Sequence, residues 1–178
     1  MRDSGFGSNQ FSLGVYIANV PNMTEYQALS NLTPLTQGEI YAIGQACGNG
    51  WRKVFNVYAK LIYALDSSKV EDISAYNSWQ KYRDEAMLQS GSNVALLFSS
   101  PRLSPVERCV KIICGRTYAK ALINTGALNA ELTWLDNEFA IDERNHVIVC
   151  PYFDYRQLSN KKIERLVKLI LSLKIEID

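Results

Sequence analysis

Four short apolar segments, spread along the chain, constrain the fold more than any other feature. Helical or polar stretches separate them, and they are FSLGVYIA (11–18), NVALLF (93–98), CVKIIC (109–114) and HVIVC (146–150). Apolar runs of this length between helical stretches are typical of strands buried on both faces of a parallel sheet. The sequence therefore predicts an α/β fold, a three-layer sandwich in which a central, mostly parallel sheet of about four strands is flanked by helices.

The length and composition of the chain fit one globular domain. The 178 residues, 47% hydrophobic and 21% charged, are enough to bury a sizeable core. Residues 1–10 are mostly polar and contain two glycines, so we expect a flexible N-terminal arm there, followed by a single α/β domain over residues 11–178.

Net charge and hydropathy narrow the choice of partners and location. The formal net charge is +1, so the chain as a whole does not attract nucleic acid or an anionic membrane, and nucleic-acid binding requires a local basic patch. No apolar run reaches the roughly 18 residues that span a bilayer, and the amino terminus has no apolar signal segment. The sequence predicts a cytoplasmic protein without a membrane partner.

Several stretches between and after the apolar segments predict helices. Residues 51–65 have apolar side chains at a clear 3.6-residue period, and residues 161–173 have the same pattern. The apolar residues Trp134, Leu135 and Phe139 indicate one more short helix.

The loop after the last apolar segment is the richest candidate site. Ligands of parallel α/β sheets bind beyond the carboxyl ends of the strands, and this loop, residues 151–158, has the sequence PYFDYRQL. Tyr152 and Arg156 suit stacking on a base and contact with a phosphate, and Asp154 suits a general base or a water-orienting group. In the alternative interpretation, the aromatic side chains pack inward and Asp154 pairs with Arg156.

Other polar residues follow the remaining segments. Asn19 and Asn22 follow the first segment and offer two amides to a ligand, although Asn and Pro also favour an ordinary turn there. Arg116 follows Gly115 at the predicted start of a helix, where backbone N–H groups suit an anion, although an ordinary strand-to-helix turn explains the same residues. Asn49 stands before the long predicted helix.

The sequence predicts no metal and no cofactor. The four cysteines form no CxxC pair, and no P-loop or GxGxxG motif follows the first segment. Three of the cysteines lie in or beside apolar segments, where a thiol behaves as a small buried hydrophobe. A reactive Cys150, at the end of the last segment, is the alternative.

Four segments in this order are similar to motifs of the uracil-DNA glycosylase superfamily, especially its mismatch-specific branch. They are ANVPN (18–22), GNGWRKVFNVYAKLI (48–62), VKIICGRTYAKAL (110–122) and VIVCPYFDYRQLSNKKIERLVKLI (147–170). The resemblance implies a four-stranded parallel sheet between helices. It also implies a water-activating residue after the first strand and a loop after the last strand that wedges into DNA.

The chain departs from this pattern where catalysis is concerned. In the family the catalytic residue directly precedes the proline of the first motif, whereas here Val20 precedes Pro21 and Asn19 lies one position earlier. The resemblance therefore implies a domain that binds a nucleobase or single-stranded nucleic acid. Its glycosylase activity would be lost or altered, with Asn19 and Asp154 as the candidate catalytic residues. The residues expected to bind the ligand are Asn22, Asn49, Arg116, Tyr152 and Arg156.

Two other classes of function remain open. One is a non-catalytic interaction module in which loop 151–158 binds a protein partner, since Tyr, Phe and Arg are common interface anchors. The other is a small-molecule hydrolase that uses Asp154 or Cys150.

Overall fold

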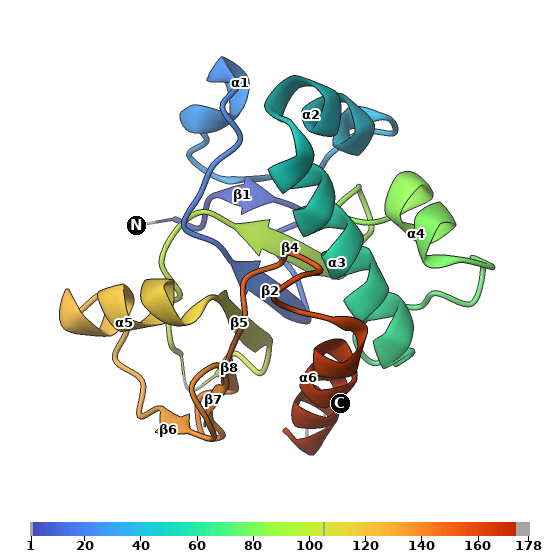
Figure 1. Cartoon of the computed structure of the whole chain (residues 1–178). Coiled ribbons are helices and arrows are strands. Elements are labelled where there is room, and N and C mark those ends of the chain that lie inside the picture. Colours follow the sequence, from blue (N-terminus) through green and yellow to red (C-terminus); the bar gives the residue numbers. More distant parts are fainter. Residues whose placement is uncertain (1, 105, 174–178) are drawn as a thin grey trace.

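One mixed sheet, flanked by helices on both faces, organises the chain (Figure 1). The computed structural model describes residues 2–104 and 106–173. The strands are β1 (Gly5–Phe6), β2 (Leu13–Tyr16), β3 (Leu32–Thr33), β4 (Val94–Leu97), β5 (Val110–Cys114), β6 (Thr133–Trp134), β7 (Ala140–Asp142) and β8 (Val147–Cys150). The helices are α1 (Thr24–Gln27), α2 (Glu39–Cys47), α3 (Asn49–Leu65), α4 (Trp79–Glu85), α5 (Arg116–Asn124) and α6 (Asn160–Ser172).

The four apolar segments form the centre of the sheet, as the sequence predicts. They are β4, β2, β5 and β8, which lie side by side in this order and are all parallel. Every residue of these four strands is buried, because helices or loops cover both faces of the sheet.

The prediction of about four mostly parallel strands is wrong for the sheet as a whole. The sheet has eight strands in the order β3-β1-β4-β2-β5-β8-β7-β6, and it is mixed, because β1 is antiparallel to β4 and β7 is antiparallel to β8. The four additional strands are only two or three residues long, and so few residues show no alternation that a sequence pattern can reveal.

The segment with Trp134, Leu135 and Phe139 is not a helix. Trp134 is the last residue of β6, and residues 135–139 form the turn that joins β6 to its antiparallel partner β7. The carboxylate of Asp136 accepts the backbone N–H groups of Glu138 at 2.7 Å and Phe139 at 2.8 Å. Such local bonds from an Asp side chain stabilise a turn in competition with a helix.

The N-terminal segment also differs from the flexible arm expected over residues 1–10. Gly5 and Phe6 form β1, which pairs with β3 and β4, and the Phe6 side chain is fully buried. Gly5 has φ +148°, and a Cβ added there would lie 2.0 Å from the Leu96 carbonyl oxygen. Only glycine fits this approach of two backbones, which explains why a glycine that resembles a linker residue lies in a strand.

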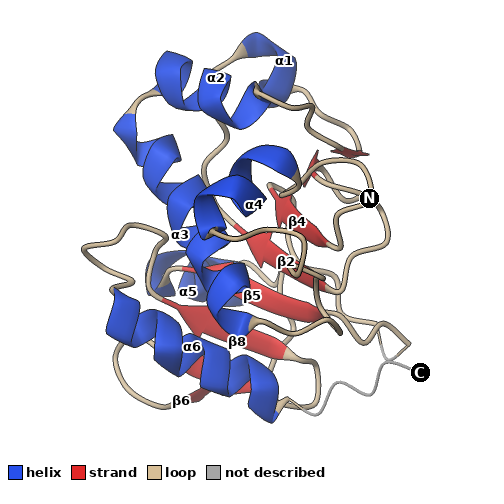
Figure 2. Cartoon of the chain, turned by 90° about the vertical axis from the view of Figure 1, so that its right-hand side faces the viewer, coloured by secondary structure: helices blue, strands red, loops and turns tan. Residues whose placement is uncertain are grey.

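The helices form two layers. α3 has the predicted apolar stripe, and with α2, α4 and α6 it packs on one face of the sheet, against side chains such as Ile112 and Ile148 (Figure 2). α5 covers the opposite face, where it packs on Ile113 and Val149. Of the helices within the described residues, none combines the length and apolar character needed to cross a membrane.

The strand order creates a topological switch point. The chain leaves β2 towards β4 on one side, whereas it leaves β5 towards β8 on the other. In open α/β sheets this reversal opens a crevice beyond the carboxyl ends of the two central strands, which is where ligands bind. We therefore expect a ligand site at the carboxyl ends of β2 and β5.

A buried carboxylate stabilises the region at the amino end of β4, away from the carboxyl ends of the strands. Glu71, between α3 and α4, accepts hydrogen bonds from Tyr82 Oη at 2.6 Å, Ser92 Oγ at 2.7 Å and the Asn93 backbone N–H at 2.8 Å. These three bonds attach the segment after α3 to α4 and to the residues just before β4.

We expect Glu71→Ala to lower the free energy of unfolding by about 3 kcal/mol, because it leaves three donors of a buried network without their charged acceptor. Chemical denaturation measures the change. Glu164→Ala, at an exposed position of α6, is the matched control and should stay within about 0.5 kcal/mol of the wild type. A change of less than about 1 kcal/mol in Glu71→Ala would show that the network is dispensable.

Candidate functional site

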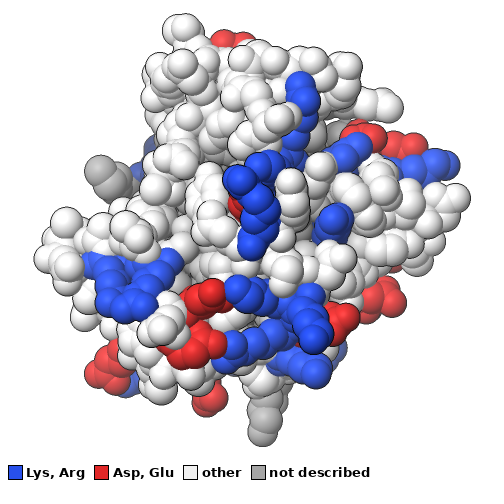
Figure 3. Space-filling model, viewed as in Figure 1, with Lys and Arg blue, Asp and Glu red and all other residues white. Residues whose placement is uncertain are grey.

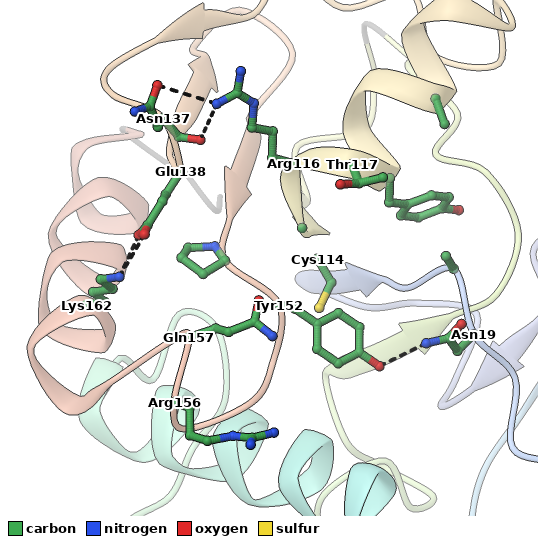
Figure 4. A pocket seen from close by; sticks show the side chains of 15 residues that line it. Asn19, Cys114, Arg116, Thr117, Asn137, Glu138, Tyr152, Arg156, Gln157 and Lys162 are labelled. Atoms are coloured by element: carbon green, nitrogen blue, oxygen red, sulfur yellow. Dashed lines mark hydrogen bonds and ion pairs between the residues drawn. The ribbon is translucent and has the colours of Figure 1, made fainter.

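A pocket of about 720 Å³ opens at the carboxyl ends of β2, β5 and β8 (Figure 4). Its walls come from the residues after β2, the start of α5, the turn between β6 and β7, the loop after β8 and the start of α6. The pocket thus lies at the switch point of the sheet, and its volume suits a ligand of nucleotide size.

Four of the predicted site residues meet in this pocket. Asn19, Arg116, Tyr152 and Arg156 all line it, although they come from three distant parts of the sequence. The parallel central strands bring them together, because the carboxyl ends of these strands lie at one edge of the sheet.

Three predicted site residues lie outside the pocket lining. Asn22 Oδ1 accepts a hydrogen bond from Gln27 Nε2 at 2.8 Å, and Asn49 Oδ1 accepts one from Arg52 Nη1 at 3.0 Å. Asp154 has both of its carboxylate oxygens engaged in ion pairs and does not line the pocket. The contacts of Asn22 and Asn49 are thus local, whereas Asp154 also pairs with Lys53 on α3.

A hydrogen-bonded pair of polar side chains lines one side of the pocket. Asn19 Nδ2 donates to Tyr152 Oη at 3.1 Å, which joins the ends of β2 and β8 (Figure 4). Partial burial raises the pKa of Tyr152, so its hydroxyl stays protonated at neutral pH. The pair presents an amide and a half-buried aromatic ring to a ligand.

The opposite wall of the pocket is cationic. Arg116, the first residue of α5, donates from Nη1 to the Asn137 carbonyl oxygen at 3.0 Å and lies over the Trp134 ring, 5.4 Å from its centroid. Both contacts are with neutral groups, and no carboxylate among residues 2–104 and 106–173 forms an ion pair with Arg116. No side chain caps the first turn of α5, so its backbone N–H groups add to the positive potential.

Asp154 is held between two cations. Arg156 Nη2 lies 2.8 Å and Lys53 Nζ lies 3.3 Å from Asp154 Oδ2, and the Arg156 backbone N–H donates to Oδ1 at 3.0 Å. The Arg156 guanidinium and backbone N–H, with Lys53, hold the pKa of Asp154 well below its usual value. A carboxylate in this state accepts a proton poorly, so these contacts favour the alternative in which Asp154 positions Arg156 at the pocket.

The aromatic residues of loop 151–158 have different environments. Phe153 is fully buried and packs edge-on against Tyr58, with ring centroids 5.8 Å apart. Tyr155 is 57% exposed, and Lys53 Nζ lies 5.2 Å from the centroid of its ring. Phe153 therefore anchors the loop to α3, and Tyr155 is the aromatic side chain that the loop presents to solvent.

Two buried thiols lie at the ends of the strands beside the pocket. Cys114 lines the pocket and accepts the Phe153 backbone N–H at 3.2 Å, and Cys150 is its register partner on the neighbouring strand. Burial raises the pKa of Cys114 to about 12 and also raises the pKa of Cys150. Neither thiol forms a thiolate readily, which argues against Cys150 as a nucleophile. Within residues 2–104 and 106–173, no group of three His, Cys, Asp or Glu side chains is placed to hold a metal.

Sequence reasoning missed part of the lining. Asn137 and Glu138 come from the turn between β6 and β7, which the sequence pattern assigned to a helix, and Lys162 comes from the first turn of α6. Lys162 Nζ pairs with Glu138 at 2.7 Å, so these two charges compensate each other. The sequence DNE (136–138) contains Asp and Asn, which favour turns, so it indicates a turn at this wall of the pocket.

The fold and the pocket together define an α/β protein with a partly cationic pocket at the switch point of its sheet. The chain belongs to DUF6942, a family of unknown function whose model matches residues 4–171. The curated proteins and the solved structures contain no match to the chain. A functional hypothesis therefore depends on the residues of the pocket.

We expect Asp154→Asn to lower the melting temperature at neutral pH, because it removes the carboxylate shared by Arg156 and Lys53. The pKa of Asp154 is lower in the folded protein than in the unfolded chain, where it is about 3.9. The ionised carboxylate therefore stabilises the fold, and this stabilisation is fully present above about pH 4. This stabilisation is lost as the pH falls through the lower folded-state pKa. The difference in melting temperature between the wild type and Asp154→Asn should therefore become smaller below about pH 4. Glu164→Gln is the exposed control, and a difference independent of pH would contradict the ion-pair assignment.

We expect the thiols of Cys114 and Cys150 to react with a thiol reagent only when the protein unfolds, because both are buried and resist ionisation. Mass spectrometry after labelling in native buffer and in denaturant measures this. Cys47, which is half-buried, is the internal control for reagent activity. Rapid labelling of Cys150 in the folded protein would restore it as a candidate nucleophile.

Proposed function

We propose that this protein binds single-stranded nucleic acid, or the nucleotide unit of it, in the pocket at the carboxyl ends of β2, β5 and β8. One observation carries the proposal: the same pocket brings together the Asn19–Tyr152 pair and the uncompensated cation Arg116 at the start of α5. A nucleotide combines a flat base with hydrogen-bonding edges and a phosphate, and these two groups of residues complement its two parts.

In this arrangement the base lies against Tyr152. Its ring gives a stacking surface, and the amides of Asn19 and Gln157, which also line the pocket, give donors and acceptors for the base edge (Figure 4). The phosphate lies towards Arg116 and the uncapped first turn of α5. Arg156, held by Asp154, contributes a second guanidinium at the rim.

The proposal includes an evolutionary relation to the uracil-DNA glycosylases with loss of base release. Hydrolysis of a glycosidic bond needs a group that orients or deprotonates a water. Asp154 is engaged by two cations, and Asn19 is a neutral amide that orients a water without accepting its proton. We therefore expect binding without efficient base release, in a cytoplasmic protein.

The two other functions have less support from the contacts. A hydrolase would need Cys150 or Asp154 as its reactive group, and burial or ion pairing restrains both. A protein-binding role for loop 151–158 would depend mainly on Tyr155, since Phe153 packs into the core and Tyr152 faces the pocket.

The test is the binding of fluorescent single-stranded oligonucleotides over a salt series, together with a base-release assay on uracil-containing strands. We expect salt-dependent binding, no release, and at least about fivefold weaker affinity for Arg116→Gln, with the salt slope reduced by about 0.7. Arg144→Gln is the matched control, because Arg144 is exposed in the β7–β8 turn at the opposite edge of the sheet.

Equal effects of the two substitutions would contradict the pocket as the binding site. Absence of binding at low salt would contradict the function itself. Base release that disappears in Asn19→Ala would retain the site and show that the protein is an active glycosylase.

A further inference from the structure

The exposed face of α3 carries several cationic side chains. Arg52, Lys53 and Lys60 lie on this helix, and at 100° per residue they fall within one arc that also contains Asn56. All the residues buried by α3 fall outside this arc. Figure 3 shows blue side chains along the course that α3 takes in Figure 1.

Neighbouring elements extend this cationic face. Arg83 of α4 donates from Nη1 to Asn56 Oδ1 at 2.6 Å, and Arg156 shares the Asp154 carboxylate with Lys53. We call these five cations the basic stripe: Arg52, Lys53, Lys60, Arg83 and Arg156. Two carboxylates, Asp84 and Asp154, pair with members of the stripe. Five cations against two carboxylates leave an excess of three positive charges on a chain whose net charge is +1.

Aromatic rings and neutral acceptors hold the cations in place. The Lys60 ammonium and the Arg83 guanidinium lie 5.2 and 5.3 Å from the centroid of the Trp79 ring. Arg52 donates to two neutral acceptors, the Gly44 carbonyl oxygen at 3.1 Å and Asn49 Oδ1 at 3.0 Å. These contacts order the side chains, and within the described part of the chain no carboxylate forms an ion pair with Arg52 or Lys60.

The stripe is continuous with the pocket. Arg156 lines the pocket and, through Asp154, is joined to Lys53 on α3. From there Arg52 and Lys60 are separated by roughly 12 Å along the helix axis, at 1.5 Å per residue. A ligand that contacts the pocket and both of these cations is therefore longer than one nucleotide.

We propose that the basic stripe is a second contact surface, which binds the sugar-phosphate backbone of a single strand whose terminal or flipped nucleotide occupies the pocket. This inference rests on the proposed function and names its ligand as an oligonucleotide. The occupant follows from charge complementarity: a stripe with an excess of three positive charges suits a polyanion, and the exposed ring of Tyr155 beside Lys53 suits an unpaired base.

The experiment compares thymidine monophosphate with oligothymidylates of about 4 and about 12 nucleotides. The stripe variant is Arg52→Gln with Lys60→Gln, and the control is Lys69→Gln with Arg144→Gln, which removes the same charge at exposed positions outside the stripe. We expect wild-type affinity to rise with length. The stripe variant should keep the mononucleotide affinity, lose most of the gain with length, and show a salt slope reduced by about 1.4.

Thermal melts verify that each variant is folded. If Arg52→Gln does not fold, Lys60→Gln alone replaces the double variant, and the salt slope should then fall by about 0.7. Long oligonucleotides that bind the stripe variant and the control equally would overturn the inference and leave the pocket proposal intact. Weak binding by the stripe variant together with normal binding by Arg116→Gln would support the stripe and overturn the pocket. No binding of any nucleotide to the wild type would overturn both.

Competitors identify the kind of polyanion. Duplex DNA that competes as well as the single strand would overturn the assignment of an unpaired ligand. Polyglutamate that competes equally would overturn a nucleic acid and indicate an acidic protein segment as the occupant.

Discussion

The arrangement of the site depends on the ion pairs that the Asp154 carboxylate forms. This carboxylate binds Arg156 at the rim of the pocket and Lys53 on α3, so one buried side chain joins the loop after β8 to the helical layer. Phe153, directly before it, anchors the same loop by packing on Tyr58. An ion pair alone would stabilise an exposed loop only weakly. Together with a buried aromatic anchor, it fixes Arg156 in one place.

The sheet determines which residues this loop can meet. Because the central strands are parallel, the segments after β2, β5 and β8 all emerge at one edge, and the reversal of strand order between β2 and β5 opens the pocket there. Asn19, Arg116 and Tyr152 are thus neighbours as a consequence of topology. The antiparallel additions at the two sides of the sheet do not alter this edge, although the turn between β6 and β7 completes one wall of the pocket.

The sequence predicts the centre of the fold well and its periphery poorly, for a physical reason. Long apolar runs and the 3.6-residue stripe of α3 reflect burial, and burial creates a pattern that can be recognised without the structure. β1 and β6 have two residues each, too few to show an alternation, and β1 also depends on pairing with β3 and β4, which are distant in sequence. The site divides in the same way. The rule about strand ends finds Asn19, Arg116, Tyr152 and Arg156, and the Asp154–Arg156 pair is one of the two interpretations that the sequence offers. The ion pair of Asp154 with Lys53 and the wall formed by Asn137 depend on three-dimensional contacts.

A near-neutral chain can still bind a polyanion, provided that its charges are segregated and ordered. Here the acidic side chains of the pocket and stripe are paired with specific cations, Glu138 with Lys162 and Asp84 with Arg83, whereas Arg116, Arg52 and Lys60 contact neutral groups. The compensated pairs hold loops and helices together, and the uncompensated cations remain for a ligand. The net charge sums the paired and the unpaired side chains, and therefore does not reveal the unpaired cations that matter for recognition.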